Sequence, residues 1–170
     1  MNRTLNLSLK NHLHMPKPVD FDVAAAHKHF STQCFNRAWD LIEKSNRTPE
    51  DDRLMVALNQ ASIFHWLQRD DCNSQRLSVG YWQASRIQAL LGNAAEALRQ
   101  ANVCLTYSEE LKPFYLGYAH EALARAHGLA GNSQAAARHL KSSLELANRV
   151  GDKGERELLL ADLRLLQGAS

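Results

Sequence analysis

Apolar residues recur along the chain at spacings of three and four from about residue 20 onward, and no segment strictly alternates apolar with polar residues. A spacing of three and four places side chains on one face of a helix, whereas alternation is typical of a strand. The sequence therefore predicts an all-α protein. The expected helices cover about residues 20–31, 33–45, 49–69, 73–92, 93–110, 113–130, 132–150 and 152–167.

Several of these helices carry clear start signals. Thr48 is followed by Pro49, which suits a capping residue and the first helical position. Asn93 precedes Glu96 by three residues, as in a capping box, and Asp152 opens the last helix in the same way. We expect these side chains to satisfy free amide groups of the first turn.

The dipeptide Gly-Asn occurs at residues 92–93 and again at 131–132, which gives a repeat of 39 residues. Each dipeptide ends one helix and precedes an alanine-rich helix. The register superposes Ala97 on Ala136, and a further step of 40 residues back brings Ala57 into the same column. Small residues in one column let paired helices approach closely, as stacked helical hairpins require.

The stretch LLGNAAEALRQANVCL resembles the tetratricopeptide repeat (TPR), with its glycine turn and alanines on the second helix. The resemblance covers about residues 33–150. The period of 39–40 exceeds the roughly 34 of the standard repeat. The Gly-x-x-Tyr of the family's first helix appears here as Ser85-x-x-Gln88 and Ala124-x-x-His127. FHWLQ, GYWQASR and YAHEALARAH are also similar to a little-characterised group of bacterial TPR-like proteins, a similarity that implies no activity.

The resemblance implies a right-handed α-α superhelix of about three TPR-like hairpins with flanking capping helices. Residues 19–170 would form this single helical-repeat domain. Residues 1–18 are predicted to be a flexible N-terminal tail, because Pro16 and Pro18 interrupt any helix there. The alternative is an arm that docks on the domain or on a neighbouring subunit.

Composition and charge indicate a cytoplasmic protein. The 170 residues carry a formal net charge of +2 and contain no basic run, so nucleic acid is not an expected partner. The sequence has neither a secretory signal pattern nor an apolar run of about 18 residues, so no membrane association is expected. Three cysteines without a CxxC pair favour buried thiols in a reducing compartment.

No motif of a nucleotide-binding loop, metalloprotease or serine hydrolase is present. The eight histidines are not spaced as metal ligands within one helix, and His120 and His127 lie two turns apart. The prediction is a non-enzymatic protein with no catalytic residues, cofactor or metal. A metal site assembled from several helices is the alternative.

The candidate site follows from the TPR resemblance, in which the first helix of each pair lines the concave surface. The positions that correspond here include Trp82, Arg86, Tyr118, Glu121 and Arg125. The two arginines fall in the same column of the repeat. Stacked guanidinium groups favour a carboxylate, which they can bind through two parallel hydrogen bonds.

Structural interpretations of these residues stay open at this point. Glu121 and Arg125 are four residues apart and can form an ion pair along the helix. Arg86 could instead reach Glu121 from the neighbouring helix, and Trp82 could serve in packing between helices. His65 is a weaker candidate for the same site, near the carboxyl end of its helix.

The main hypothesis is a binding or scaffold module that recognises a peptide or protein segment, carrying a carboxylate, on its concave face. One alternative is a small-molecule sensor or unrecognised enzyme with a pocket around Glu121 and Arg125. Another is a structural oligomerisation subunit. The last helix, GERELLLADLRLLQ, spreads leucines over more than one stripe. It therefore either caps the repeats or forms a homodimer.

Overall fold

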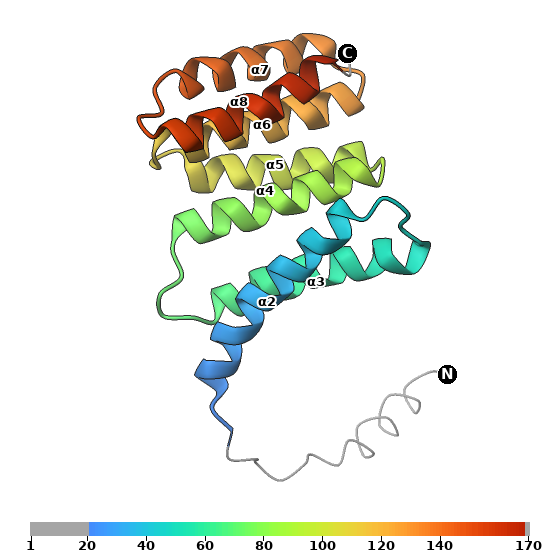
Figure 1. Cartoon of the computed structure of the whole chain (residues 1–170), viewed down its shortest axis with the longest axis vertical. Coiled ribbons are helices and arrows are strands. Elements are labelled where there is room, and N and C mark those ends of the chain that lie inside the picture. The colour runs from blue at the N-terminus through green and yellow to red at the C-terminus, as the bar shows by residue number, and fades with distance from the viewer. Residues whose placement is uncertain (1–20, 169–170) are drawn as a thin grey trace, which may run out of the picture.

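The computed structural model describes residues 21–168, which contain seven helices and no strand (Figure 1). The all-α prediction is confirmed. The helices are α2 (Val23–Glu43), α3 (Pro49–Leu67), α4 (Ser74–Leu90), α5 (Ala94–Ser108), α6 (Pro113–Leu129), α7 (Ser133–Ala147) and α8 (Lys153–Gly168). The expected tail at residues 1–18 lies outside the described residues.

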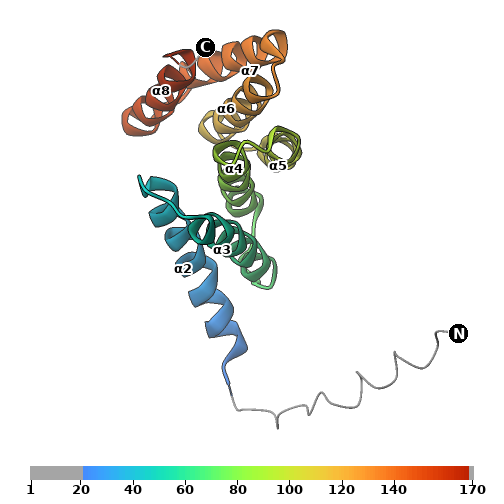
Figure 2. The ribbon, with the colours of Figure 1, turned by 90° about the vertical axis from the view of Figure 1, so that its right-hand side faces the viewer.

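The helices pair as three consecutive hairpins, α2 with α3, α4 with α5 and α6 with α7. The last helix, α8, packs against α6 and α7 and covers the end of the stack. Figure 2 shows α2 and α8 on the same side of the stack, with α5 on the opposite side. Within residues 21–168 one capping helix is therefore found, after the hairpins, and none before them.

The expected helices at residues 20–31 and 33–45 are one continuous helix, α2, so that prediction was wrong. Asp22 caps its start by accepting a hydrogen bond from the Ala25 amide at 2.9 Å. The predicted break contains no glycine or proline. Ser31, at that point, is fully buried, and its carbonyl accepts the Ser62 hydroxyl of α3 at 2.7 Å. At the point of the predicted break, α2 therefore packs closely against α3.

Two of the predicted helix starts are confirmed. Thr48 and Asp51 form a reciprocal capping box, in which the Asp51 amide donates to Thr48 Oγ1 and the Thr48 amide donates to the Asp51 carboxylate. Asp152 Oδ1 accepts the Glu155 amide at 2.8 Å. Each cap satisfies amide groups that the first helical turn leaves free.

The capping box predicted at Asn93 does not form. The side chain of Asn93 makes no cap hydrogen bond and instead donates to Gln88 Oε1 at 2.9 Å. Glu96, the expected second member, binds Arg99 of the next turn. An arginine three residues away therefore outcompetes the helix terminus for this carboxylate.

Both Gly-Asn turns end their helices as predicted. Gly92 and Gly131 have φ angles of 77° and 75°, in the left-handed region that glycine adopts without strain. In both turns the following asparagine amide donates back into the helix, at 2.9 Å, to the carbonyl of Gln88 in one case and of His127 in the other. This pattern satisfies carbonyl groups at the helix end.

Small residues bring the helices close together. Ala97 and Ala101 of α5 are fully buried. On α6, a Cβ atom added at Gly117 would lie 2.6 Å from a methyl carbon of Leu159, so only glycine leaves room for α8 at this point. Leu159 and Leu163 are fully buried there. This contact places α8 directly against α6.

None of the helices between residues 21 and 168 has the length and apolar character needed to cross a membrane.

Candidate functional site

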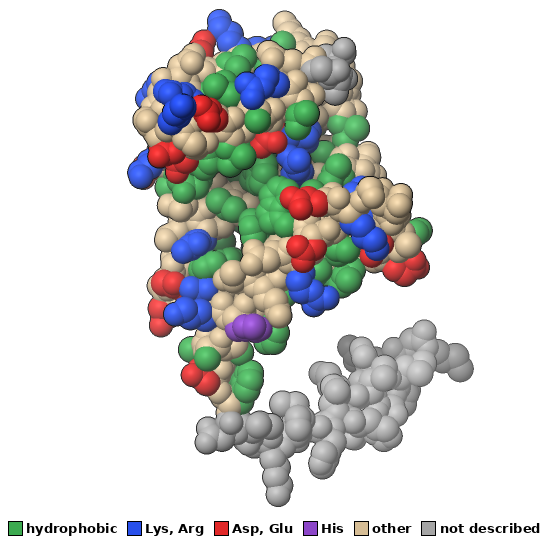
Figure 3. All heavy atoms as spheres, viewed as in Figure 1, with side chains coloured by type: hydrophobic (Ala, Val, Ile, Leu, Met, Phe, Trp, Pro, Cys, Tyr) green, Lys and Arg blue, Asp and Glu red, His purple; other side chains and the backbone are tan. Residues whose placement is uncertain are grey.

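A cavity of about 440 Å³ opens between α2, α4, α6 and α8. Figure 3 shows it as a hollow with apolar side chains inside and charged side chains at its margin. It thus lies on the side formed by the first helix of each hairpin together with α8. Its lining residues are Phe35, Trp39, Glu43, Ser78, Val79, Trp82, Arg86, Phe114, Tyr115, Tyr118, Leu158 and Asp162.

Five aromatic rings form a continuous wall of this cavity. From α2 to α6, the ring centroids of Phe35 and Trp39 lie 6.4 Å apart, those of Trp39 and Trp82 5.6 Å, those of Trp82 and Tyr118 5.0 Å, and those of Tyr118 and Phe114 5.1 Å. The pairs are tilted or edge-to-face, arrangements that aromatic rings prefer. The wall therefore offers ring faces and edges to an apolar group.

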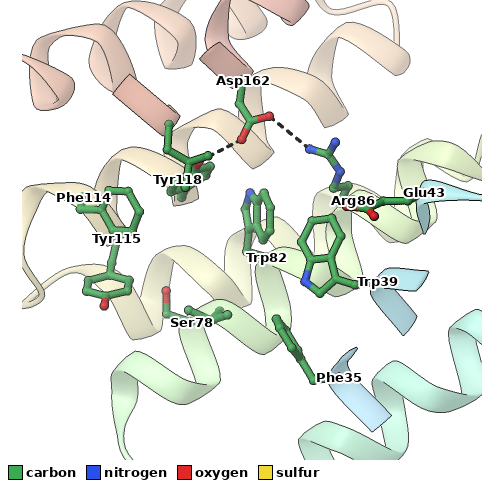
Figure 4. Close-up of a pocket in the computed structure, with 12 residues that line it drawn as sticks. Phe35, Trp39, Glu43, Ser78, Trp82, Arg86, Phe114, Tyr115, Tyr118 and Asp162 are labelled. Atoms are coloured by element: carbon green, nitrogen blue, oxygen red, sulfur yellow. Dashed lines mark hydrogen bonds and ion pairs between the residues drawn. The ribbon is translucent and has the colours of Figure 1, made fainter. Parts of the chain in front are cut away.

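The upper rim of the cavity is polar. Asp162 of α8 lies between Tyr118 and Arg86 (Figure 4). Its Oδ2 accepts the Tyr118 hydroxyl at 2.9 Å, and its Oδ1 lies 3.7 Å from Arg86 Nη1. The guanidinium carbon of Arg86 lies 5.6 Å from the Trp39 ring and 5.7 Å from the Trp82 ring, within range of a cation–π contact.

Arg86 has unused hydrogen-bonding capacity. Its Nε and Nη1 atoms are buried and have no hydrogen-bond acceptor among residues 21–168. The 3.7 Å separation from Asp162 exceeds the length of a hydrogen bond. Buried donors without acceptors carry a desolvation cost, which an anionic group in the cavity would remove.

Tyr118 is held as a hydrogen-bond donor. Burial raises the pKa of its hydroxyl far above the usual value, and the carboxylate of Asp162 raises this pKa further. The phenol is therefore protonated at neutral pH and donates to Asp162. This hydrogen bond fixes the orientation of the carboxylate beside Arg86.

Glu121 lies outside the cavity, contrary to the expectation that it faces the concave surface. It is fully buried and accepts hydrogen bonds from Trp82 Nε1, at 2.8 Å, and from Arg125 Nη2. The ion pair along the helix is therefore found, and Arg86 pairs with Asp162 rather than with Glu121. A carboxylate enclosed in this way is not accessible as a base.

Arg125 lines a different cavity, of about 680 Å³, together with Ala89, Gly128 and other small or leucine side chains. The two arginines of the repeat therefore do not face a common cavity. The prediction that their stacked guanidinium groups bind one carboxylate was wrong. The cause is Glu121, which draws Arg125 to its own helix. Trp82, Arg86 and Tyr118 do line the first cavity.

His65 is placed away from the other candidates. Its Nδ1 lies 2.8 Å from Nδ1 of His27, and its ring contacts those of Phe30 and Phe64. Burial, and to a smaller extent His27, lowers the pKa of His65. It is not among the residues that line either cavity.

Three histidines gather between α6 and α7. The ring of His139 stacks against those of both His120 and His127, and Nδ1 of His139 lies 3.0 Å from Nδ1 of His120. His139 of α7 thus joins two histidines of α6. Across the described residues, no group of three or more histidine, cysteine, aspartate or glutamate side chains could hold a metal ion.

The sequence interpretation missed Phe35 and Trp39 of α2 and Asp162 of α8. Phe35 and Trp39 are four residues apart and share a helix face, a signal already present in the helix expected at residues 33–45. Asp162 is an acidic residue directly before Leu163 in the leucine-rich helix. An acid at the edge of an apolar stripe indicates a polar partner across the interface.

No family model, curated protein or solved structure matches this chain.

Proposed function

We propose that this protein is a non-enzymatic, TPR-like binding module that recognises a carboxylate-bearing peptide or protein segment on its concave face. In this proposal the three hairpins correspond to TPR-like repeats in a right-handed superhelix. The observation that carries the proposal is Arg86, which lines an aromatic-walled cavity and whose buried Nε and Nη1 lack an acceptor among the described residues.

The chemistry of the cavity supports this assignment. The fork of Arg86 would donate to both oxygens of a carboxylate, and an apolar side chain of the same ligand would cover the rings of Trp39, Trp82 and Tyr118. A volume of about 440 Å³ accommodates one large side chain and the carboxylate beside it. Arg125 takes no part, since it is bound to Glu121.

The test is calorimetric titration of the full chain with a synthetic peptide library. Each peptide places an aromatic residue beside a carboxylate and is paired with the corresponding amide. We expect binding of the carboxylate forms, with a loss of at least tenfold for the amides, because the amide removes the charge that Arg86 recognises.

Variants locate the binding site. Arg86→Gln keeps much of the side-chain length and removes the charged fork, so it should abolish the preference for the carboxylate. Arg99→Gln is the matched control, because Arg99 is an exposed arginine whose partner is Glu96 on α5. An unchanged preference in Arg86→Gln would refute the proposed site.

A further inference from the structure

We infer that the same cavity also accommodates a free α-amino acid with a large apolar side chain, its carboxylate on Arg86 and its ammonium on Asp162. This inference rests on the proposed function in one respect, because Arg86 is the carboxylate-binding group in both. The inference adds a second charged contact, between Asp162 and the ammonium. It also names a ligand of another class, which would compete with a peptide for the cavity.

The charges of the rim also suit a ligand that carries a cation beside its anion. Arg86 is the only cation among the residues that line the cavity, whereas Asp162 and Glu43 are both acidic. A ligand with only a carboxylate would bring a third negative charge beside these two. A ligand with adjacent positive and negative groups complements both members of the Arg86–Asp162 pair.

The Arg86–Asp162 pair is too long for a hydrogen bond. Nη1 of Arg86 and Oδ1 of Asp162 are 3.7 Å apart, whereas charge-assisted hydrogen bonds measure about 2.7–2.9 Å. Neither group therefore satisfies the other directly. In an α-amino acid the ammonium and the carboxylate are attached to one carbon, so they can contact two partners that are close neighbours.

Each charged group of the amino acid finds a matching partner. Its carboxylate would pair with the guanidinium of Arg86, whose Nε and Nη1 have no acceptor in the described part of the chain. Its ammonium would donate to Oδ1 of Asp162. The other oxygen, Oδ2, is already held by the Tyr118 hydroxyl, which fixes the carboxylate in place.

The aromatic wall selects the side chain. The guanidinium carbon of Arg86 lies 5.6 Å from the Trp39 ring and 5.7 Å from the Trp82 ring. A side chain attached to the same carbon as the bound carboxylate therefore reaches these rings. An aromatic or large aliphatic side chain would cover them, whereas glycine would leave them in water.

The charge of Asp162 favours a free amino acid over the end of a peptide at this position. The last residue of a peptide has a neutral amide group in place of the ammonium. That amide could donate one hydrogen bond to Asp162 but would bring no counter-charge. The ammonium supplies both, and hydrogen bonds between two charged groups are stronger than those with a neutral donor.

The experiment is calorimetric titration of the full chain with four probes: L-phenylalanine, N-acetyl-L-phenylalanine, L-phenylalaninamide and glycine. N-Acetylation removes the positive charge, the amide removes the negative charge, and glycine removes the side chain. We expect L-phenylalanine to bind, at least tenfold weaker binding of the two blocked forms, and no detectable binding of glycine.

The Asp162→Asn variant tests the contact between Asp162 and the ammonium separately from the contact between Arg86 and the carboxylate. The variant keeps the shape and an acceptor for Tyr118 but removes the charge, so phenylalanine and its N-acetyl form should then bind equally. Arg86→Gln should weaken both. If Asp162→Asn does not fold, the ratio of the affinities of the unmodified protein for phenylalanine and N-acetylphenylalanine is sufficient to test the inference.

The outcomes distinguish this inference from the proposed function. Equal affinity of the unmodified protein for phenylalanine and N-acetylphenylalanine overturns the amino-acid inference, as does binding of library peptides without any binding of phenylalanine. Both results leave carboxylate recognition through Arg86 intact. Phenylalanine binding that Arg86→Gln does not alter overturns the inference and the proposed site together.

Discussion

Arg86 and Arg125 occupy the same position in consecutive repeats, yet their surroundings differ. One turn before Arg125 lies Glu121, which is fully buried and binds it directly. The corresponding position before Arg86 is Trp82, so the counter-charge of Arg86 comes from Asp162 on α8 instead. The residue one turn earlier thus decides whether the arginine pairs with a carboxylate of its own helix or with one of α8.

The hairpins α4–α5 and α6–α7 also differ at one packing position on their first helices. Ser78 of α4 corresponds to Gly117 of α6, 39 residues later. The Ser78 hydroxyl lies 2.7 Å from that of Ser108, whereas Gly117 has no side chain and leaves room for Leu159 of α8. The hairpin α6–α7 can therefore receive a capping helix at this position, and that helix brings Asp162 to Arg86.

The largest expected effect comes from Arg125→Ala. This change leaves Glu121 fully buried with Trp82 as its remaining donor, and breaking a buried ion pair from one side costs about 3–5 kcal/mol. Urea denaturation should show this loss in the free energy of unfolding. Arg86→Ala, in the same column, should lose less, because its partner Asp162 is 3.7 Å away and, unlike Glu121, is not fully buried. Equal losses would contradict the distinction between the two arginines.

Gly117→Ala should lower the free energy of unfolding by about 1–3 kcal/mol, because the added methyl would lie 2.6 Å from Leu159 in a packed interface. Hydrogen exchange should locate the change in α8. The matched control is Gly128→Ala on the same helix, where an added Cβ meets no described atom within 4 Å. That variant should be no less stable than the original protein. A loss in both would point to a general effect on α6 instead of the contact with α8.

The two asparagines after the glycine turns should respond unequally to alanine. Asn132 caps α7 by accepting the Ala135 amide at 3.1 Å, so Asn132→Ala should cost about 1 kcal/mol. Asn93 makes no such bond, and Asn93→Ala should cost at most a few tenths of a kcal/mol. Thermal unfolding of the two variants side by side measures the difference. A greater loss at Asn93 would refute the assignment of the caps.

The smallest effect expected is a pH dependence of stability from the hairpin α6–α7, which contains His120, His127 and His139. Burial lowers the pKa of His120 and of His139, and His120, His127 and Arg138 lower that of His139 further. Both groups therefore stabilise the fold above the unfolded-state pKa of about 6.5, and this stability is lost as the pH falls below it. Urea midpoints between roughly pH 8 and roughly pH 5 should show the loss, and His139→Gln should reduce it. An unchanged slope in that variant would assign the effect elsewhere.

The sequence predicts the helices well where a local signal decides them. The Gly-Asn turns and the cap at Thr48 involve residues a few positions apart, and the structure contains both. The break expected near residue 32 does not occur, and at this point Ser31 accepts a hydrogen bond from Ser62 across the hairpin. Long-range packing of this kind is not visible in a local pattern.

The candidate site was predictable only in part for the same reason. Trp82, Arg86 and Tyr118 follow from the repeat and line the cavity. The burial of Glu121 and the arrival of Asp162 depend on how α6 and α8 pack against their neighbours. The repeat specifies which positions are equivalent, but the neighbours of each position decide what its side chain does.

The distribution of the three tryptophans makes the protein suited to optical study. Trp39 and Trp82 wall the cavity, with their ring centroids 5.6 Å apart, whereas Trp66 is buried elsewhere beneath the guanidinium of Arg69. Fluorescence emission and near-ultraviolet circular dichroism of the first two should change when a molecule covers their rings. The signal of Trp66 should stay constant, so the unlabelled chain contains both a reporter of occupancy and its internal reference.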